Sequence, residues 1–597
     1  MPIAPYLYVL PALALLGVWI YRPLVQTFQL SFYSWNLLPT QPLTPVGLQN
    51  YTSVATSPQL RDALVNTGVY IAAFLVFSVV LPIVIALVSR RVGGRAKTVY
   101  QAIIFVPFLV TPVAAAAVWR WLLSDSGGAI PTALQHFGID IGDVLRSPSG
   151  AIWAIIAIVG WQMLGFGVLV VSAGIAGINP DYAHAASIDG AGSWTILRRI
   201  TLPLLSPTIV FLVLMTILLS AQWTYPMIDI LTQEALATRR PTCTTCFTRS
   251  GSRTLTPAPR ERQERSSSSR SASSPSGWSP CPTASRSTTT RSTLMALVPV
   301  TGLVAPLRPL APATSAAAPS RERSATRSSG RTATVVGHVV LVVVSVASIF
   351  PIYWMFATAF RQPVDATAES LFPWPMSLQS FVTVWQQIPI LSMIGNTFLM
   401  AFAVAACQLI IAILAAYGFA MWQFPGKSIL FLFFIGSWLV PFQVTMIPNY
   451  VLISQLGLLG TLAGVIVPNL CSAFAVMLMR QHMQSFPREL IDAAHMDGRN
   501  NWSVLLRVIL PNMRPALAAL GIMLFIEAWN NYLWPSLIFQ HQSDALIQVG
   551  IRSFLGAEGD NWGAIMAASG LACLPIFLIY LFLQRYIVDA FVRSGLR

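Results

Sequence analysis

Long apolar segments, separated by short polar ones, run through almost the whole chain. Each is about 20 residues or longer, which is enough for a helix to cross a hydrocarbon core of roughly 30 Å. Only helices or closed barrels satisfy the backbone in lipid, and barrel strands are far shorter, so we expect helices. The runs cover residues 5–30, 66–89, 99–123, 151–175 and 203–228, and then 334–360, 394–421, 428–453, 460–481, 511–534 and 564–587.

One polar stretch between two apolar runs occurs twice. AHAASIDGAGSWTILRRITLP spans 183–203 and IDAAHMDGRNNWSVLLRVILP spans 491–511, a constant offset (511 − 203 = 308). The shared Asp-Gly is typical of a helix end that needs a positive φ. Leu-Pro then begins the next span. The sequence therefore predicts a helix, a glycine turn and a second short helix in each of two homologous halves.

The halves are joined by a segment of very different composition. Residues 1–234 form the first predicted helix bundle and 333–597 the second, whereas 235–332 is rich in Arg, Ser, Thr and Pro. That composition predicts disorder. The first bundle then has five spans where the second has six, so its sixth helix is missing. We hypothesise that 235–332 is frame-shifted; the alternative is a basic linker lying on anionic lipid.

Composition and charge place the protein in a membrane. The chain is 55% hydrophobic and 10% charged, against about 25% charged residues in soluble domains. The net charge of +15 does not indicate nucleic-acid binding, because residues 239–331 contribute 15 Arg and three Glu, or 15 − 3 = +12. Basic residues beside the repeated stretches place both stretches on the cytoplasmic side. We expect a multi-pass protein of a cell membrane, from a bacterium.

No motif predicts catalysis. Gly426-Lys427-Ser428 resembles the end of a phosphate-binding loop, but the earlier glycine position holds Met421 and the motif leads into an apolar run. It is better read as a tight turn with an interfacial lysine. Cys243 and Cys246 have metal-like spacing without a second pair. We therefore predict no catalytic residue, no metal ligand and no cofactor site in this chain.

The repeated stretch resembles the signature loop of binding-protein-dependent ABC transporter permeases. That signature reads Glu-Ala-Ala, three residues, Gly, nine residues, Ile, one residue, Leu-Pro. Here the Glu position holds His184 and Asp492, and the second copy has Val508 at the Ile position. The loop residues that this resemblance assigns to ATPase coupling are His184, Ala185, Ala186, Asp189, Gly190, Leu202, Pro203, Asp492, Ala493, Ala494, Asp497, Gly498, Leu510 and Pro511.

The resemblance implies partners and a substrate class. It implies two cytosolic ABC ATPase subunits, which would bind ATP and Mg²⁺, and an extracytoplasmic solute-binding protein. The sequence looks most like carbohydrate permeases of the maltose and sn-glycerol-3-phosphate type, with two subunits fused in one chain. An ion-coupled secondary transporter is the alternative, although its repeats are often inverted. A non-functional fused relic is a third reading.

Polar and aromatic residues in the span after each repeated loop are candidates for the solute pathway. Ionisable and amide groups within a span are costly and commonly face a pathway. Interfacial anchoring and hydrogen bonding between helices explain them equally well. The candidates are Gln222, Trp223, Tyr225, Asp229, Glu527, Trp529, Asn530, Asn531 and Trp534.

Overall fold

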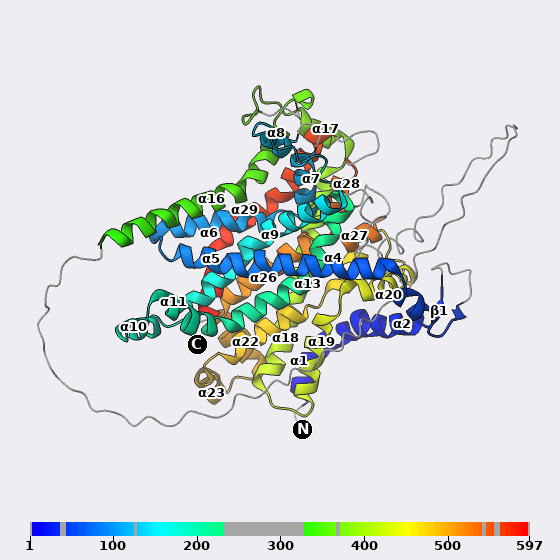
Figure 1. Cartoon of the computed structure of the whole chain (residues 1–597). Coiled ribbons are helices and arrows are strands. Elements are labelled where there is room, and N and C mark those ends of the chain that lie inside the picture. Colours follow the sequence, from blue (N-terminus) through cyan, green and yellow to red (C-terminus); the bar gives the residue numbers. More distant parts are fainter. Residues whose placement is uncertain are drawn as a thin grey trace, which may run out of the picture.

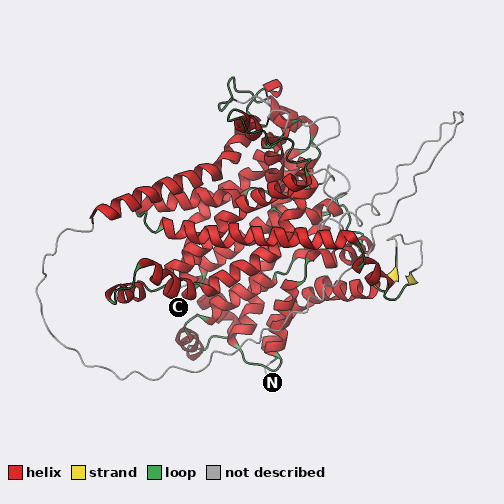
Figure 2. Ribbon diagram, viewed as in Figure 1, coloured by secondary structure: helices red, strands yellow, loops and turns green. Residues whose placement is uncertain are grey.

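The computed structural model describes residues 3–35, 43–124, 128–231, 327–365, 370–539, 545–554 and 561–594. This part is almost entirely helical (Figure 2). Its strands are two residues long and form one antiparallel hairpin, β1 (Tyr33–Ser34) with β2 (Thr44–Pro45). The predictions about 232–326, including the frame shift, lie outside the described residues.

Helices of the first half follow one another with short connections. They are α1 Ala4–Leu16, the π-helical turn η1 Gly17–Tyr21, α2 Arg22–Leu30, α3 Gln49–Ala55, α4 Pro58–Leu75, η2 Val76–Val80, α5 Leu81–Ser89, α6 Gly94–Leu109, α7 Pro112–Leu122, α8 Ala129–Gln135, α9 Pro148–Ala176, α10 Pro180–Ile188, α11 Ser193–Ile196, η3 Leu197–Thr201, α12 Leu202–Leu204 and α13 Ser206–Leu231.

The second half follows a similar but not identical order. Its helices are α16 Arg327–Ala359, η4 Pro363–Asp365, α17 Gln379–Gln387, α18 Ile390–Met421, α19 Lys427–Leu439, α20 Phe442–Gln455, α21 Leu462–Ile466, η5 Val467–Asn469, α22 Ala473–Gln484, α23 Arg488–Met496, α24 Asn501–Val504, η6 Leu505–Ile509, α25 Leu510–Asn512, α26 Arg514–Trp529, α27 Leu533–Ile538, α28 Ile547–Arg552 and α29 Trp562–Ser594.

All eleven predicted apolar runs are helical in the described residues, but three of them are sharply bent. In the described residues eight spans are continuous and three are helix pairs. The pairs are α6–α7 with a bend of 95°, α19–α20 with 92° and α21–α22 with 45°. The prediction of one helix per apolar run was wrong for these three runs. The cause at α6–α7 is Pro112, which holds Thr111 in an extended conformation, where its hydroxyl caps α7.

The two halves interlock through their first long helices. α1 of the first half packs along α18 of the second, and α16 of the second packs along α6 of the first. Val9 of α1 fits against Gly418 of α18, where any Cβ would lie only 2.8 Å from the valine side chain. One continuous hydrophobic core therefore contains residues of both halves.

Both repeated loops lie at the same end of the helical bundle. Figure 1 shows α10, α11 and α23 at one end, and α8, α17 and α28 at the other. We call these the loop side and the far side. The repeat is therefore parallel, as expected for two homologous bundles, and not inverted.

The described chain stops and resumes on opposite sides. Near the end of α13, the carbonyl of Ile230 accepts a hydrogen bond of 3.3 Å from Arg120, at the far-side end of α7. Beside Arg120, the ring of Trp121 lies 5.4 Å from that of Trp354, near the end of α16. α16 therefore also ends on the far side, and its 33 residues span about 50 Å back to the loop side.

Candidate functional site

The two repeated loops have the same backbone structure. Each consists of a nine-residue helix, a glycine turn, a four-residue helix, a π-helical turn and a final three-residue helix. Every helix boundary is offset by the same number as the sequence repeat (488 − 180 = 308 and 512 − 204 = 308). The predicted helix, glycine turn and helix are confirmed in both copies.

A glycine in the left-handed region ends the first helix of each loop. Gly190 has φ of 82° and Gly498 has φ of 75°. In the first copy the N–H of Ala191 donates to the carbonyl of Ala186 at 2.9 Å, and the N–H of Gly190 donates to that of Ser187 at 3.2 Å. These two bonds define a Schellman motif, which needs a residue that tolerates positive φ. The second copy repeats them, from Arg499 to Ala494 and from Gly498 to His495.

Both loops present apolar side chains to solvent. Ile188 is 85% exposed and its counterpart Met496 is 88% exposed. Trp194 and Trp502, also 308 residues apart, are exposed large hydrophobics as well. Because these apolar groups recur at matched positions, the two loop tips are candidates for an interaction surface.

The residues at the glutamate position of the signature are exposed in both copies. His184 lies on α10 and Asp492 on α23, each one residue before the two alanines. Neither side chain has a partner in the described part of the chain. Both are therefore accessible to a docking protein, and their assignment to ATPase coupling stays a prediction.

The loops differ in how the bundle supports them. No residue of α10 is buried, whereas α23 buries Ile491 and Ala494. The second loop is also bonded to the bundle, because the Tyr417 hydroxyl donates to the carbonyl of Asn501 at 2.9 Å. The ring of Tyr8, from α1 of the other half, stacks 6.2 Å from that of Trp502.

Two of the predicted pathway residues are packed in the helical core. Trp529 and Trp534 are buried, with 0% and 1% exposure. The indole of Trp529 donates to the carbonyl of Ala572 at 3.2 Å, and that of Trp534 donates to the carbonyl of Gly464 at 3.1 Å. In this conformation both indoles form hydrogen bonds to other helices, and their assignment to a solute pathway stays a prediction.

The other predicted pathway residues range from exposed to buried. Glu527 is exposed near the middle of its span, between the buried Ile526 and Ala528. Asn530 keeps both side-chain polar atoms buried without a hydrogen-bond partner, an arrangement that is costly unless another polar group reaches them. The remaining candidates are Gln222, with its side chain outside the described part, the half-buried Tyr225 and Asn531, and Trp223, which stacks on Phe108 with ring centroids 5.4 Å apart.

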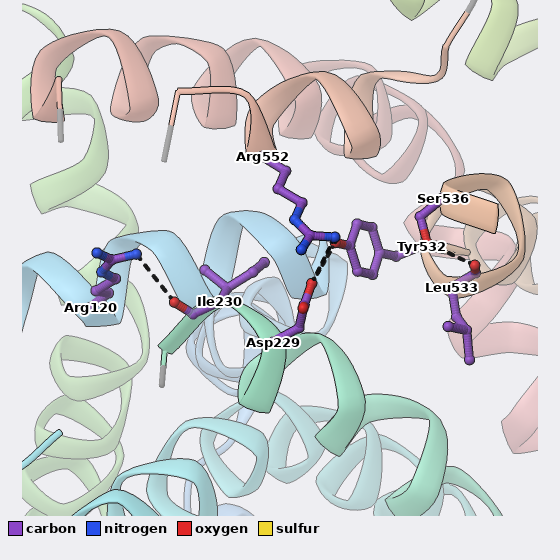
Figure 3. Close-up of polar contacts among 7 residues, drawn as sticks. All are labelled: Arg120, Asp229, Ile230, Tyr532, Leu533, Ser536 and Arg552. Atoms are coloured by element: carbon purple, nitrogen blue, oxygen red, sulfur yellow. Dashed lines mark hydrogen bonds and ion pairs between the residues drawn. The ribbon is translucent and has the colours of Figure 1, made fainter. Parts of the chain in front are cut away.

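Asp229 joins the two halves on the far side (Figure 3). Its carboxylate lies 3.3 Å from the Arg552 guanidinium and accepts a hydrogen bond of 2.7 Å from the Tyr532 hydroxyl. Arg552 also donates to that hydroxyl at 3.2 Å. Burial alone would lower the pKa of Arg552, but the neighbouring Tyr532 and Asp229 outweigh it and raise the pKa. Sequence reasoning missed Tyr532 and Arg552.

The Gly426-Lys427-Ser428 segment, which resembles the end of a phosphate-binding loop, forms a turn. Gly426 has φ of 77° and immediately precedes α19. The ammonium of Lys427 donates to the carbonyl of Trp422 at 2.8 Å. The predicted tight turn is confirmed, and the interfacial place of Lys427 stays a prediction.

A family profile described as "Binding-protein-dependent transport system inner membrane component" matches this chain twice, at residues 78–241 and 408–593. The second match contains the whole loop α23–α25, and the first contains the whole loop α10–α12. The chain belongs to this family. It is therefore a multi-pass inner membrane component of a binding-protein-dependent transport system, with two copies of the family domain.

Individual relatives have the size of one half. The sn-glycerol-3-phosphate transport system permease protein UgpE of Yersinia pestis is 31% identical over 272 residues, which is 43% of this chain and 95% of the relative. The arabinooligosaccharides transport system permease protein AraQ of Halalkalibacterium halodurans is 26% identical, over 42% of this chain and 91% of its own length. The lactose transport system permease protein LacG of Rhizobium radiobacter is 29% identical, over 44% and 95%.

Among solved structures, a bacterial ABC transporter involved in the import of alginate is similar to this chain. The match has 21% identity and a TM-score of 0.41, and covers 44% of this chain and 99% of that one.

Proposed function

We propose that this chain supplies both membrane subunits of an ATP-driven importer, with its two repeated loops as docking sites for two cytosolic ABC ATPases. One observation carries the proposal: two loops of the same backbone structure, 308 residues apart, lie on one side of the bundle. Each has an exposed apolar tip, Ile188 or Met496. Two loops of equivalent structure fit two equivalent partner subunits.

Each loop is connected directly to the far-side contact between the halves. α12 leads into α13, which carries Asp229 near its end, and α25 leads into α26, which ends three residues before Tyr532. A change in the spacing of the loops is therefore carried by two rigid helices to the Asp229–Tyr532–Arg552 contact. We infer that closing of the ATPases parts this contact and opens the pathway to the far side.

ATP and Mg²⁺ belong to the partner subunits in this proposal. The function of this chain is to bind those subunits, enclose the solute and change conformation. The solute-binding protein delivers its cargo to the far side, where α8, α17 and α28 lie.

The proposed solute is a sugar or sn-glycerol-3-phosphate. Relatives named for arabinooligosaccharides, sn-glycerol-3-phosphate and lactose support this class. Within the chain, the exposed carboxylate of Glu527 and the unpartnered amide of Asn530 offer hydrogen bonds that sugar hydroxyls require.

Reconstitution tests the function. The full chain, its ATPases and its binding protein are placed in vesicles, and uptake of radiolabelled lactose, arabinooligosaccharide and sn-glycerol-3-phosphate is measured. We expect uptake of one of them with ATP and none with a non-hydrolysable analogue. Uptake driven by an ion gradient without ATP would instead support a secondary transporter. Absence of uptake in a correctly assembled complex would support a relic.

A further inference from the structure

A cleft lined by both apolar and polar residues lies at the base of the first repeated loop, and nothing in the proposed function uses it. Its volume is about 230 Å³, smaller than the roughly 300 Å³ at which pockets for whole organic ligands begin. Four polar side chains line it: Ser89, Arg90, Lys97 and Ser172. The cleft therefore has room for a single headgroup-sized anion.

The cations of this cleft have no partner in the described part of the chain. The side chains of Arg90 and Lys97 form no hydrogen bond, ion pair or ring contact there. Ser172 accepts a hydrogen bond of 3.0 Å from Gln101, which leaves its O–H free to donate. Lys97 lies in the first turn of the 16-residue helix α6, where the helix dipole also favours an anion. The acidic residue nearest in sequence to this lining is Asp181, which is exposed on α10 and directly follows Pro180.

Two cations at the corresponding positions of the second half contact groups of that half. Lys427, in the first turn of α19, donates to the carbonyl of Trp422 at 2.8 Å. Arg480, at the position of Ser172 (480 − 172 = 308), lies over the Phe431 ring at 4.0 Å. These two cations thus contact a carbonyl and an aromatic ring of their own half, while the Nε of Arg480 has no hydrogen-bond partner in the described residues. Arg90 and Lys97 make no such side-chain contact in the described part of the first half.

The cleft lies at the depth of lipid headgroups. Its residues Ala86 and Ser89 end one membrane span, and Ile175 and Ala176 end another, both on the loop side. A phosphate bound at the end of two spans belongs to the headgroup layer. The cytoplasmic leaflet, on which the basic residues place the loops, carries anionic lipids.

We propose that this cleft binds the phosphate of an anionic phospholipid, which steadies α10. Arg90 and Lys97 supply charge-assisted hydrogen bonds to the phosphate, and Ser172 supplies a neutral one. Since the cleft includes Ile178 and Pro180, a bound phosphate ties the start of α10 to the α5–α6 connection. The lipid thereby replaces the packing that Ile491 and Ala494 give to α23.

Lipid titration of the purified full chain tests the site. Delipidated protein in neutral detergent at 0.15 M salt is titrated with phosphatidylglycerol, and native mass spectrometry measures bound lipid. We expect the double variant Arg90→Gln/Lys97→Gln to bind roughly tenfold more weakly. The matched control is Arg91→Gln/Arg95→Gln, which removes the same charge from the same connection outside the cleft and should change affinity by no more than about twofold, since salt screens it. Equal losses in both double variants, or none, would overturn the proposal.

Two further measurements fix the source and the place of binding. Phosphatidylcholine or inorganic phosphate binding as tightly as phosphatidylglycerol would overturn an anionic lipid as the ligand. Hydrogen exchange should slow in 180–188 on adding phosphatidylglycerol and stay unchanged in 488–496. An equal response of both loops would contradict a cleft specific to the first. Neither readout depends on ATPase binding, so this proposal can fail while the proposed function stands.

Discussion

The two repeated loops have one backbone but two kinds of support. α10–α12 and α23–α25 share every helix boundary at the 308-residue offset and the same glycine turn. Yet α23 is anchored by buried side chains and α24 by a hydrogen bond from Tyr417, whereas α10 buries nothing. The shape of the loop is thus a property of its own sequence, because turn bonds within the loop define it. Its attachment is a property of the surrounding bundle.

Comparing the two loops shows which structural features they share and which differ between them. The shared features are the turn, the exposed tip and the direct continuation into α13 or α26. The varied features are the packing below the loop and the residue before Ala-Ala, His184 or Asp492. Because the two loops share the turn, we expect a change at the turn glycine to impair whichever loop carries it. Because only the second loop packs its first helix on the bundle, we expect changes in that packing to impair the second loop alone.

The largest effect is expected from the turn glycines. Gly190→Val and Gly498→Val each place a β-branched residue at positive φ, which costs about 1–2 kcal/mol or more and disorients the helices around it. We expect each to lower ATP-dependent uptake by about tenfold or more. The control is Gly192→Ala, because Gly192 has φ of −69° and nothing within 4 Å of an added Cβ. If only Gly498→Val impaired uptake, the first loop would not be an equivalent docking site.

A smaller effect is expected where the helices from the two loops meet. Arg552→Gln leaves the half-buried Asp229 without its counter-charge, at a cost of about 1–2 kcal/mol in the closed far side. We expect altered uptake in Arg552→Gln and in Asp229→Asn, and a double variant whose effect is less than their sum.

The control for that cycle is Arg146→Gln, which breaks an exposed pair with Asp143 and should have no effect. Strict additivity of the two single variants would show that the ion pair does not couple the halves.

The acidic residue of the second loop should matter more than the histidine of the first. Asp492→Ala removes an exposed carboxylate able to pair with a cation of a docking protein, so we expect it to weaken ATPase binding several-fold, or about 1 kcal/mol. His184→Ala should change binding less than twofold, and His184→Glu should strengthen it. Pull-down titrations with the purified ATPase measure all three, and equal losses at the two positions would contradict the asymmetry.

The smallest effect is expected from the anchor of the second loop. Tyr417→Phe removes one hydrogen bond to Asn501, worth about 0.5–1.5 kcal/mol. We expect hydrogen exchange to rise in 501–504 and to stay unchanged in 193–196. An unchanged rate in 501–504 would show that Tyr417 does not hold the loop.

Much of the fold follows from the sequence alone. All eleven apolar runs are helical, because an apolar backbone of that length in lipid leaves no alternative to a helix. The bends could not be predicted. Pro226, Pro351 and Pro575 lie inside continuous helices, whereas the helix breaks beside Pro112 and Pro441. Whether a proline breaks a span depends on what packs against the freed backbone, which one sequence does not reveal.

The same limit applies to the site. The loop conformation was predictable because Asp-Gly acts locally. The pairing of Asp229 with Arg552 was not, since 323 residues separate them (552 − 229) and Arg552 lies in a far-side segment outside any apolar run. Burial of Trp529 and Trp534 was equally hidden, because an indole in a span serves a pathway or a core with the same sequence signal.

Site-specific cross-linking tests most directly whether both loops dock equivalent partners. Single cysteines replace Ile188 or Met496, the matched exposed tips, in the full chain assembled with its ATPases and treated with a short thiol cross-linker. The account predicts a cross-link to an ATPase subunit from each position, and two ATPases per chain when both cysteines are present. A cross-link from Met496 but none from Ile188, in a complex that still hydrolyses ATP and transports solute, would contradict it.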